Sequence, residues 1–415
     1  MIDPGRRAAR RLHPMNHATP SADTAPDPAA GPSARPDPDP TTLRPDNVDQ
    51  LRRMVTGHAR LAVTAGRSKT PLVAGGDGVA VIDLAGLTGL TEYEPDEYTF
   101  TAGAGTPLTE LAAALAGNGQ YLPFDPPLAD LGATLGGTVA AGLSGAGRWR
   151  YGGLRDFILG IGFIDADGRL IRGGGRVVKN AAGFDLPKLM VGSLGRLGIL
   201  TELTFKVFPS PPGHRTIRVD ASDLDDALRR IARLARQPLD LWALDLEPPA
   251  TLWLRVAGDE ASVESHAHRV ATAAGPGSRV LPAADDPGHW RDQARFGWLP
   301  DDHLLLRLAL TPDRIPPLEQ ALAAAAKTGT TAQTGADPVP PRRYSVAGNL
   351  AWVGWPAAAP LPDLGELGGL IVRAPAGTAL PPGAPRLGPR PAGADAFARR
   401  IKHALDPGAR FGPLP

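Results

Sequence analysis

Glycine and alanine crowd residues 132–145, which read GATLGGTVAAGLSG. In so dense a run of small residues the backbone itself is what a ligand contacts, because glycine has no Cβ atom to hold a ligand away from main-chain N–H groups. From there to Pro209 the chain alternates turn residues with short apolar runs. We therefore expect a pocket walled by main chain and suited to a large cofactor that carries phosphate.

Two short loops offer hydrogen-bond donors to an anion. Residues 65–70 (AGRSKT) present successive N–H groups and three polar side chains, and residues 134–138 (TLGGT) present a second set of N–H groups. Two such loops could hold a pyrophosphate from opposite sides. The alternative is a pair of tight turns, which is the usual meaning of an isolated Gly-Gly. The chain has no Walker A pattern and no G-x-G-x-x-G between a strand and a helix, which argues against P-loop and Rossmann sites.

Charge and residue types exclude several functions. The 415 residues leave room for two or three domains, and 44 basic against 43 acidic side chains give a formal charge of +1. No basic block favours nucleic acid as a partner. The chain has no cysteine, so it cannot ligate an iron–sulfur centre, and any such centre must come from another subunit. No apolar run is long enough for a transmembrane helix. We expect a cytoplasmic protein that reaches a membrane only through partners.

Composition also divides the chain. Residues 1–44 are mostly proline, alanine, aspartate and arginine, and we expect them to be disordered because they bury too little surface to offset their ordering entropy. Residues 45–210 and 211–415 are expected to form two α+β domains, with Pro211-Pro212-Gly213 at the boundary.

Apolar periodicity predicts the secondary structure of both domains. The first should contain helices over 48–55, 107–116 and 185–190, strands over 61–64, 79–83, 99–102 and 197–208, and a hairpin of 157–165 with 169–172. The second should contain helices over 223–236, 260–274, 313–326 and 395–405, and strands over 241–246, 252–256 and 304–310. The second pattern favours an antiparallel sheet covered by helices.

Three ordered motifs carry a family resemblance: GATLGGTVAAGLSG, then RYGGLRDFILG, then KNAAGFDLPKLMVGSLGRLGILTELTFKVFP. They resemble the flavin-binding domain of the vanillyl-alcohol-oxidase superfamily, also called the p-cresol methylhydroxylase (PCMH) type, and the final DPGARFGP is similar to that family's ending. The resemblance implies a two-subdomain FAD-binding domain, then a smaller α+β cap domain with a returning C-terminal tail. It is strongest to FAD-binding subunits of bacterial glycolate oxidase, which assemble with a larger flavin subunit and an iron–sulfur subunit.

Transferred position by position, the resemblance also implies a site. Against the pyrophosphate it places Gly66, Arg67, Ser68 and Lys69; along the flavin and ribityl side, Thr134, Gly136, Gly137, Ala141 and Ser144; and at the adenosine end, Gly198, Ile199 and Leu200. Asp156 and Lys179-Asn180 are expected to support the pocket, and Asp185 to cap a helix.

Departures from the family pattern bear on the function. Arg67 stands where the family has a glycine, so it either adds a charge for the phosphate or crowds the loop. Residues 65–70 hold no histidine, which relatives with covalent FAD use for attachment, so we expect noncovalent FAD. The histidine-rich metal and substrate motif of the larger catalytic flavoproteins is not found, and we expect no metal.

Four histidines and three other residues leave their roles open: His266, His268, His289, His303, Arg307, Trp352 and Trp355. His266 and His268 point to different faces of a predicted helix and are expected to be solvated. Arg307, inside the apolar run LLLRLAL, binds a substrate carboxylate or pairs with an acid, and it is our one candidate catalytic residue. The two tryptophans wall a pocket or pack in the core.

The resulting expectation is an FAD-dependent oxidoreductase acting on CH–OH groups. As the FAD-binding subunit of a glycolate oxidase complex, it would take part in the oxidation of a small 2-hydroxy acid by hydride transfer to flavin. A stand-alone hydroxy-acid or sugar dehydrogenase is one alternative. A flavin-less scaffold subunit, suggested by the altered Arg67 loop, is another.

Overall fold

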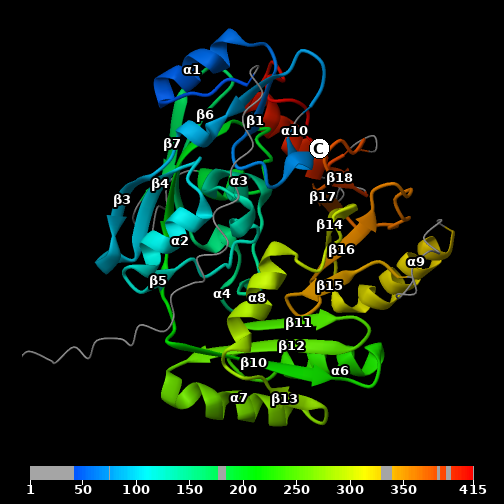
Figure 1. Cartoon of the computed structure of the whole chain (residues 1–415). Helices are drawn as coiled ribbons and strands as arrows, with labels where there is room; N and C mark the ends of the chain where they lie inside the picture. Colours follow the sequence, from blue (N-terminus) through cyan, green and yellow to red (C-terminus); the bar gives the residue numbers. More distant parts are fainter. Residues whose placement is uncertain are drawn as a thin grey trace, which may run out of the picture. The chain divides into compact units, whose positions relative to one another are not determined.

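The computed structural model describes residues 42–73, 75–175, 184–328, 339–380, 384–388 and 394–414 (Figure 1). Residues 34–415 form one compact unit. Residues 1–41 of the predicted disordered extension, together with Lys179 and Asn180, lie outside the described residues. Leu43, which we assigned to that extension, instead pairs in parallel with Ile82. The folded chain therefore starts ahead of the predicted boundary at residue 45.

The first half of the chain builds two two-stranded sheets and one larger sheet, together with short helices. Its elements are α1 (Val48–Gly57), β1 (Leu61–Thr64), β2 (Ala80–Asp83), β3 (Leu90–Glu94), β4 (Thr99–Gly103), α2 (Leu108–Ala116), β5 (Gln120–Tyr121), α3 (Leu135–Ala141), α4 (Arg148–Tyr151), β6 (Ile158–Ile164), β7 (Leu170–Gly174), α5 (Leu186–Met190), β8 (Ile199–Lys206) and β9 (Phe208–Pro209). β1 and β2 pair in parallel, β5 and β9 pair antiparallel, and five antiparallel strands follow the order β3-β4-β8-β6-β7.

Local chemistry explains where these elements begin. Asn47 caps α1, because its side chain accepts a hydrogen bond from the N–H of Gln50 at 2.9 Å. Asp185 caps α5 in the same way, with the N–H of Lys188 donating at 3.1 Å, as expected. The predicted helix over 107–116 and the predicted hairpin are confirmed as α2 and as β6 with β7.

The second half builds a single antiparallel sheet of nine strands. Its elements are β10 (Gly213–Asp220), α6 (Leu224–Leu234), β11 (Ala243–Glu247), β12 (Thr251–Gly258), α7 (Glu260–Ala274), β13 (Ser278–Val280), α8 (Asp285–Arg295), β14 (His303–Ala309), α9 (Ile315–Thr328), β15 (Arg342–Ser345), β16 (Leu350–Pro356), β17 (Gly369–Arg373), β18 (Arg386–Leu387) and α10 (Ala394–Leu405). The strand order is β13-β10-β12-β11-β15-β16-β14-β17-β18. Our expectation of an antiparallel sheet with helices is confirmed.

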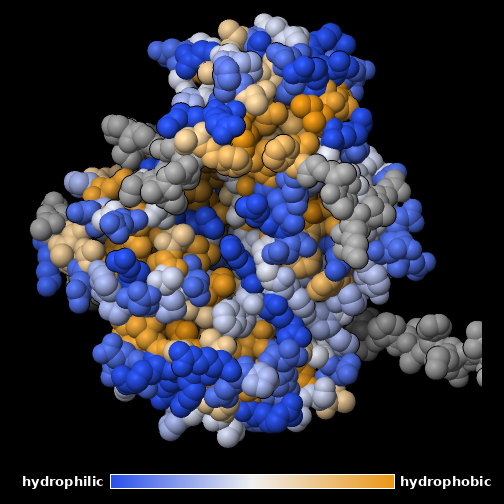
Figure 2. All heavy atoms as spheres, turned by 180° about the vertical axis from the view of Figure 1, so that it is seen from behind, coloured by the Kyte–Doolittle hydropathy of each residue, from blue (hydrophilic) through white to orange (hydrophobic). Residues whose placement is uncertain are grey.

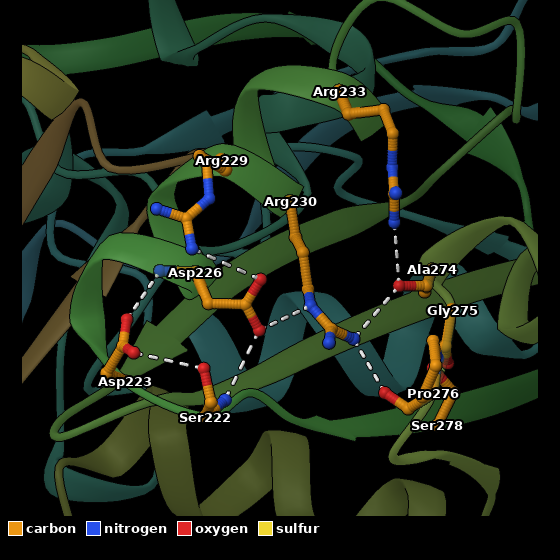
Figure 3. Close-up of polar contacts among 10 residues, drawn as sticks. All are labelled: Ser222, Asp223, Asp226, Arg229, Arg230, Arg233, Ala274, Gly275, Pro276 and Ser278. Atoms are coloured by element: carbon orange, nitrogen blue, oxygen red, sulfur yellow. Dashed lines mark hydrogen bonds and ion pairs between the residues drawn. The ribbon is translucent and has the colours of Figure 1, made fainter.

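Two arginines of α6 donate hydrogen bonds to backbone carbonyl oxygens at and just after the end of α7, and so join the two helices (Figure 3). Arg230 donates to the carbonyl oxygens of Ala274 and Pro276 at 3.1 and 2.7 Å, and Arg233 donates to Ala274 at 2.8 Å. The last carbonyl groups of a helix have no partner within the helix. The two arginines satisfy such groups at the end of α7, and Asp226 orients Arg230 through a contact of 2.9 Å.

The chain leaves the five-stranded sheet at the end of β8, pairs through β9 with β5, and enters the nine-stranded sheet at Gly213. Hydrogen bonds then join the two parts: Trp242 Nε1 donates to Asp125 at 3.2 Å, and the N–H of Leu128 donates to the Ala294 carbonyl at 2.9 Å. We retain residues 45–210 and 211–415 as our proposed domains.

The C-terminal segment lies against the first half of the chain. The N–H of Leu61 in β1 donates to the carbonyl oxygen of Arg410 at 2.7 Å, and Phe411 is buried in the same hydrophobic cluster as Leu61. Asp406 accepts hydrogen bonds from the N–H groups of Arg410 and Phe411 and so shapes this turn.

On the face shown in Figure 2, hydrophilic residues predominate and hydrophobic residues gather in patches between them. Among the described residues, the large hydrophobic side chains left exposed are Tyr98, Phe184 and Phe397. None of the helices in the described ranges combines the length and the apolar character needed to cross a bilayer.

Candidate cofactor site

A pocket lies where the end of β1, the loop after it, α3 and the start of β8 meet. It is lined by Val63, Thr64, Ala65, Gly66, Arg67, Ser68, Lys69, Leu72, Val73, Leu84, Ala104, Thr134, Gly136, Gly137, Ala140, Ala141, Leu194, Gly195, Gly198, Ile199 and Leu200. All the predicted cofactor residues are therefore brought together except Ser144. Nothing in the sequence marks the apolar lining residues, such as Leu72, Leu84 and Leu194, as part of a pocket.

Ser144 has a different position from the one expected. Its side chain is buried, and its Oγ accepts a hydrogen bond from the N–H of Leu154 at 3.1 Å. Ser144 is not among the residues that line the pocket. Ser144 therefore holds the segment after α4 in place. In that segment Asp156 accepts a hydrogen bond from the N–H of Gly153 at 2.8 Å.

The loop after β1 carries unused hydrogen-bond donors. Across the described part of the chain, the N–H groups of Gly66, Arg67, Ser68 and Lys69 find no hydrogen-bond acceptor. Arg67 turns the loop with φ at 52°, in the left-handed region that glycine usually occupies. Successive N–H groups in such a turn form a concave anion site.

The loop before α3 does not supply the second set of free N–H groups that we expected. The N–H groups of Leu135 and Gly136 donate to carbonyl oxygens within residues 104–106, at 2.9 and 2.8 Å. The N–H of Gly137 donates to Oγ1 of Thr134 at 3.2 Å. The expectation was wrong because TLGGT begins a helix, and its first N–H groups are already satisfied by a cap and a neighbouring strand end.

Several glycines of the site are required by packing. A Cβ atom on Gly136 would lie 2.7 Å from Cβ of Ala104, and one on Gly198 would lie 2.7 Å from the ring of Phe163. At Gly137 the added atom would instead meet only Thr134 Oγ1 at 3.1 Å and Lys69 Nζ at 4.0 Å. Gly137 is therefore the glycine whose missing side chain keeps space beside Lys69.

Lys69 is a buried amine in this pocket. Its side chain is 8% exposed, and Nζ donates to Oγ of Ser68 at 2.9 Å. Burial lowers the pKa of Lys69 to about 8. Within the described ranges no carboxylate forms an ion pair with it. Because a buried charge is costly without a partner, Lys69 is poised to accept an anion.

Arg67 has a partner within the protein. Its guanidinium lies 3.8 Å from the carboxylate of Asp83, which also lies 3.5 Å from Arg44. Asp83 is buried and caps the turn that follows β2. Arg67 is therefore paired with Asp83. This pairing argues against the alternative in which Arg67 mainly adds a charge for the phosphate.

A second cleft lies between α2, the segment 121–129, α8 and the nine-stranded sheet, and Trp352 lines it, as one of our alternatives proposed. Asp245 in this cleft accepts hydrogen bonds from Ser345 Oγ at 2.9 Å and from the N–H of Val346 at 3.1 Å. Burial raises the pKa of Asp245 to about 7 in spite of these bonds. Such a carboxyl group can take up or release a proton near neutral pH.

Arg307 lies apart from both cavities. It belongs to β14, and no carboxylate in the described part of the chain pairs with it. Burial and, second, the charge of Arg148 lower the pKa of Arg307 to about 10. Trp355 is part of the core of the second half, where its Nε1 donates to the Pro360 carbonyl at 3.0 Å.

The histidines make ordinary structural contacts. His268 is exposed and lies 3.2 Å from Glu264, whereas His266, expected in solvent, lies 2.9 Å from the Leu239 carbonyl. His289 stacks on Trp253 at 4.0 Å, and His303 contacts Asp302 at 2.7 Å. In the ranges that the structure describes, no cluster of acidic and histidine side chains could hold a metal ion.

Comparison with known proteins identifies the first part of the chain. Residues 41–174 match the family described as FAD binding domain. The chain is 40% identical over 218 residues to "Glycolate oxidase subunit GlcE" of Escherichia coli, covering 52% of this chain and 61% of that protein. It is 31% identical over 179 residues to a D-lactate dehydrogenase of Archaeoglobus fulgidus, covering 43% of this chain and 40% of that one. Residues 41–174 thus match an FAD binding domain, and the pocket lies largely within them.

Two further comparisons concern a second sequence relative and the fold. Over 195 residues the chain is 29% identical to "Glycolate oxidase subunit GlcD" of Bacillus subtilis, covering 46% of this chain and 41% of that protein. The solved structure of alkyldihydroxyacetonephosphate synthase is similar with a TM-score of 0.62 at 14% identity, covering 90% of this chain and 76% of that one. The mixed α and β fold expected for a PCMH-type protein is confirmed. The chain spans less than two thirds of the length of these three sequence relatives.

Proposed function

We propose that the pocket binds FAD noncovalently, with the pyrophosphate against residues 66–69 and the adenosine end against residues 198–200. Thr134, Gly137 and Ala141 would line the flavin and ribityl side. The observation that carries this proposal is the set of four adjacent N–H groups without an acceptor beside a buried lysine. Both features fit a diphosphate, and an anion there would give the unpaired donors an acceptor.

We further propose that the chain is the FAD-binding subunit of a complex that oxidises a 2-hydroxy acid, with glycolate as the best-supported substrate. The similarity to a glycolate oxidase subunit supports this reading, and the similarities to D-lactate dehydrogenases support the substrate class. FAD, when bound, supplies the acceptor for a hydride from the α-carbon of the substrate. The residues of this chain hold and orient that cofactor.

The similarity to glycolate oxidase subunits supports a larger flavin subunit and an iron–sulfur subunit as the partners. Because this chain has no cysteine, iron–sulfur centres that accept the electrons would belong to another subunit. Attachment to a membrane would come through those partners. In this complex the chain would pass electrons onward while the larger subunit oxidises the substrate.

Asp245 favours a second candidate, a stand-alone FAD-dependent dehydrogenase. Oxidation of an alcohol needs a group that accepts the hydroxyl proton at an accessible pKa. We identified no such group in the sequence, and the buried Asp245 in the second cleft is one that the structure adds. If it serves this role, the chain could oxidise its substrate without a larger subunit.

The test is made with the purified chain, alone and co-expressed with a larger flavin subunit and an iron–sulfur subunit. We expect a yellow protein whose flavin is released to the supernatant by acid precipitation, because no histidine is present in residues 65–70. Glycolate-dependent dye reduction should rise by orders of magnitude in the complex. Equal rates for the isolated chain would favour the stand-alone enzyme, and a chain that stays colourless after reconstitution with FAD would favour a scaffold.

A further inference from the structure

We propose that Lys69 is the counter-charge of the diphosphate and that, in alkaline solution, its amine takes up a proton as the diphosphate binds. The inference rests on the proposed FAD site. It adds that Lys69 makes the site prefer a diphosphate and that the affinity for FAD depends on pH. It follows from where the amine is buried and from what surrounds it.

The amine lies between the two loops of the pocket. A Cβ atom on Gly137 would be 4.0 Å from Nζ of Lys69, so the amine faces the start of α3 as well as its own loop. An ammonium has three N–H donors, and one of them is used by Ser68 Oγ at 2.9 Å. The N–H groups of α3 nearby are donors already in use, so the remaining N–H groups of Lys69 need an acceptor from a ligand.

No charged group on the neighbouring described segments neutralises the charge of this amine. On the same loop Arg67 pairs with Asp83 of β2, and before β8 Arg196 donates to the Leu72 carbonyl at 3.4 Å. Neither Asp83 nor Arg196 perturbs Lys69, whose pKa is lowered to about 8 by burial alone. α3 carries no charged side chain. A diphosphate would therefore bring the first negative charge to Lys69.

The sign of the pH effect follows from linkage. Below about pH 8 the amine of the free protein already carries its proton, so binding takes up none and the affinity is constant. Above that pH the free protein has lost the proton that the complex needs. The dissociation constant for FAD should then rise about tenfold for each pH unit.

The experiment is isothermal titration of the full chain, freed of flavin, with FAD and with ADP-ribose from about pH 6.5 to about pH 9.5. ADP-ribose carries the diphosphate without the flavin ring. At the high end, measurements in buffers of different ionisation enthalpy should give uptake of about one proton per FAD bound. The variant Lys69→Met should bind FAD at least tenfold more weakly at neutral pH and show neither the pH slope nor the proton uptake.

Lys188→Met is the matched control, because Lys188 is exposed and pairs with Asp185 at 2.9 Å, away from the pocket residues. It should behave as the parent chain does. A parent chain that binds FAD with a pH-independent affinity and no proton uptake would overturn this inference while leaving the FAD site intact. A parent chain that binds neither FAD nor ADP-ribose at any pH would overturn the proposed function itself.

Discussion

Gly66 crosses Gly132 so closely that a Cβ atom on Gly66 would lie 1.6 Å from the carbonyl oxygen of Gly132. The contact joins the loop after β1 to the segment before α3, which are the two walls of the pocket. Residue 66 must therefore be glycine for a reason of packing as well as of ligand access.

The variant Gly66→Ala should separate these walls. We expect loss of flavin and a fall in the free energy of unfolding of about 1–3 kcal/mol, since a backbone oxygen cannot yield to a methyl group. Gly57→Ala is the control, because a Cβ atom on Gly57 meets nothing within 4 Å. The measurements are the flavin content and urea unfolding. Full flavin content in Gly66→Ala would contradict the role given to this crossing.

Gly136 and Gly137 should respond differently to substitution. Gly136→Val should lower the melting temperature, because its side chain would collide with Ala104, whose Cβ lies only 2.7 Å from the added Cβ position. Gly137→Val should keep the fold and lose FAD, because its branches would fill space beside Lys69. Thermal unfolding and flavin absorbance distinguish the two. Retention of stoichiometric FAD by Gly137→Val would show that the cofactor lies elsewhere.

Arg67→Gly should change the affinity for FAD by no more than about threefold. Glycine adopts the φ of 52° without strain, and the guanidinium that is lost pairs with Asp83. Equilibrium dialysis with FAD measures the effect. A tenfold weaker variant would mean that Arg67 meets the phosphate after all, and a tenfold tighter one would mean that it crowds the loop.

Asp245→Asn should flatten the pH dependence of stability. With the pKa of Asp245 at about 7 in the folded chain, the native state holds a proton between about pH 4 and pH 7 that the unfolded chain releases. This stabilisation is present at low pH and is lost as the pH rises, by up to about 1.4 kcal/mol per pH unit. Urea unfolding at several pH values should show the slope in the parent chain and in Asp363→Asn, whose carboxylate is exposed. A slope unchanged in Asp245→Asn would refute the assignment.

The sequence predicted the elements that have strong local signals. The helix that begins at Val48, the strand 61–64 and the helix 260–274 lie where apolar periodicity placed them. Strand β10 was missed because it starts at Gly213, inside the Pro-rich segment that we interpreted only as a boundary. A boundary signal and the start of a strand are compatible, since proline restrains only its neighbours.

The site shows the limit of such prediction. The glycine-rich segment indicated the pocket correctly, yet α3 within it was not expected, and so its N–H groups were wrongly counted as free. A short helix of LGGTVAA has too little side-chain periodicity to be recognised. Asp245 and Ser345 lie one hundred residues apart, so their hydrogen bond depends on strand pairing that no local pattern reveals.

The loop after β1 presents main-chain N–H groups, and every residue other than proline possesses one. A substitution there by any residue except proline keeps the donor, provided that the chain keeps the same path. Outside Gly66 and Lys69, the loop can thus diverge in composition while its ligand stays the same, and Arg67 at a φ of 52° is an instance of that freedom. The backbone path of this turn is therefore a better guide to relatives of this chain than its amino-acid sequence.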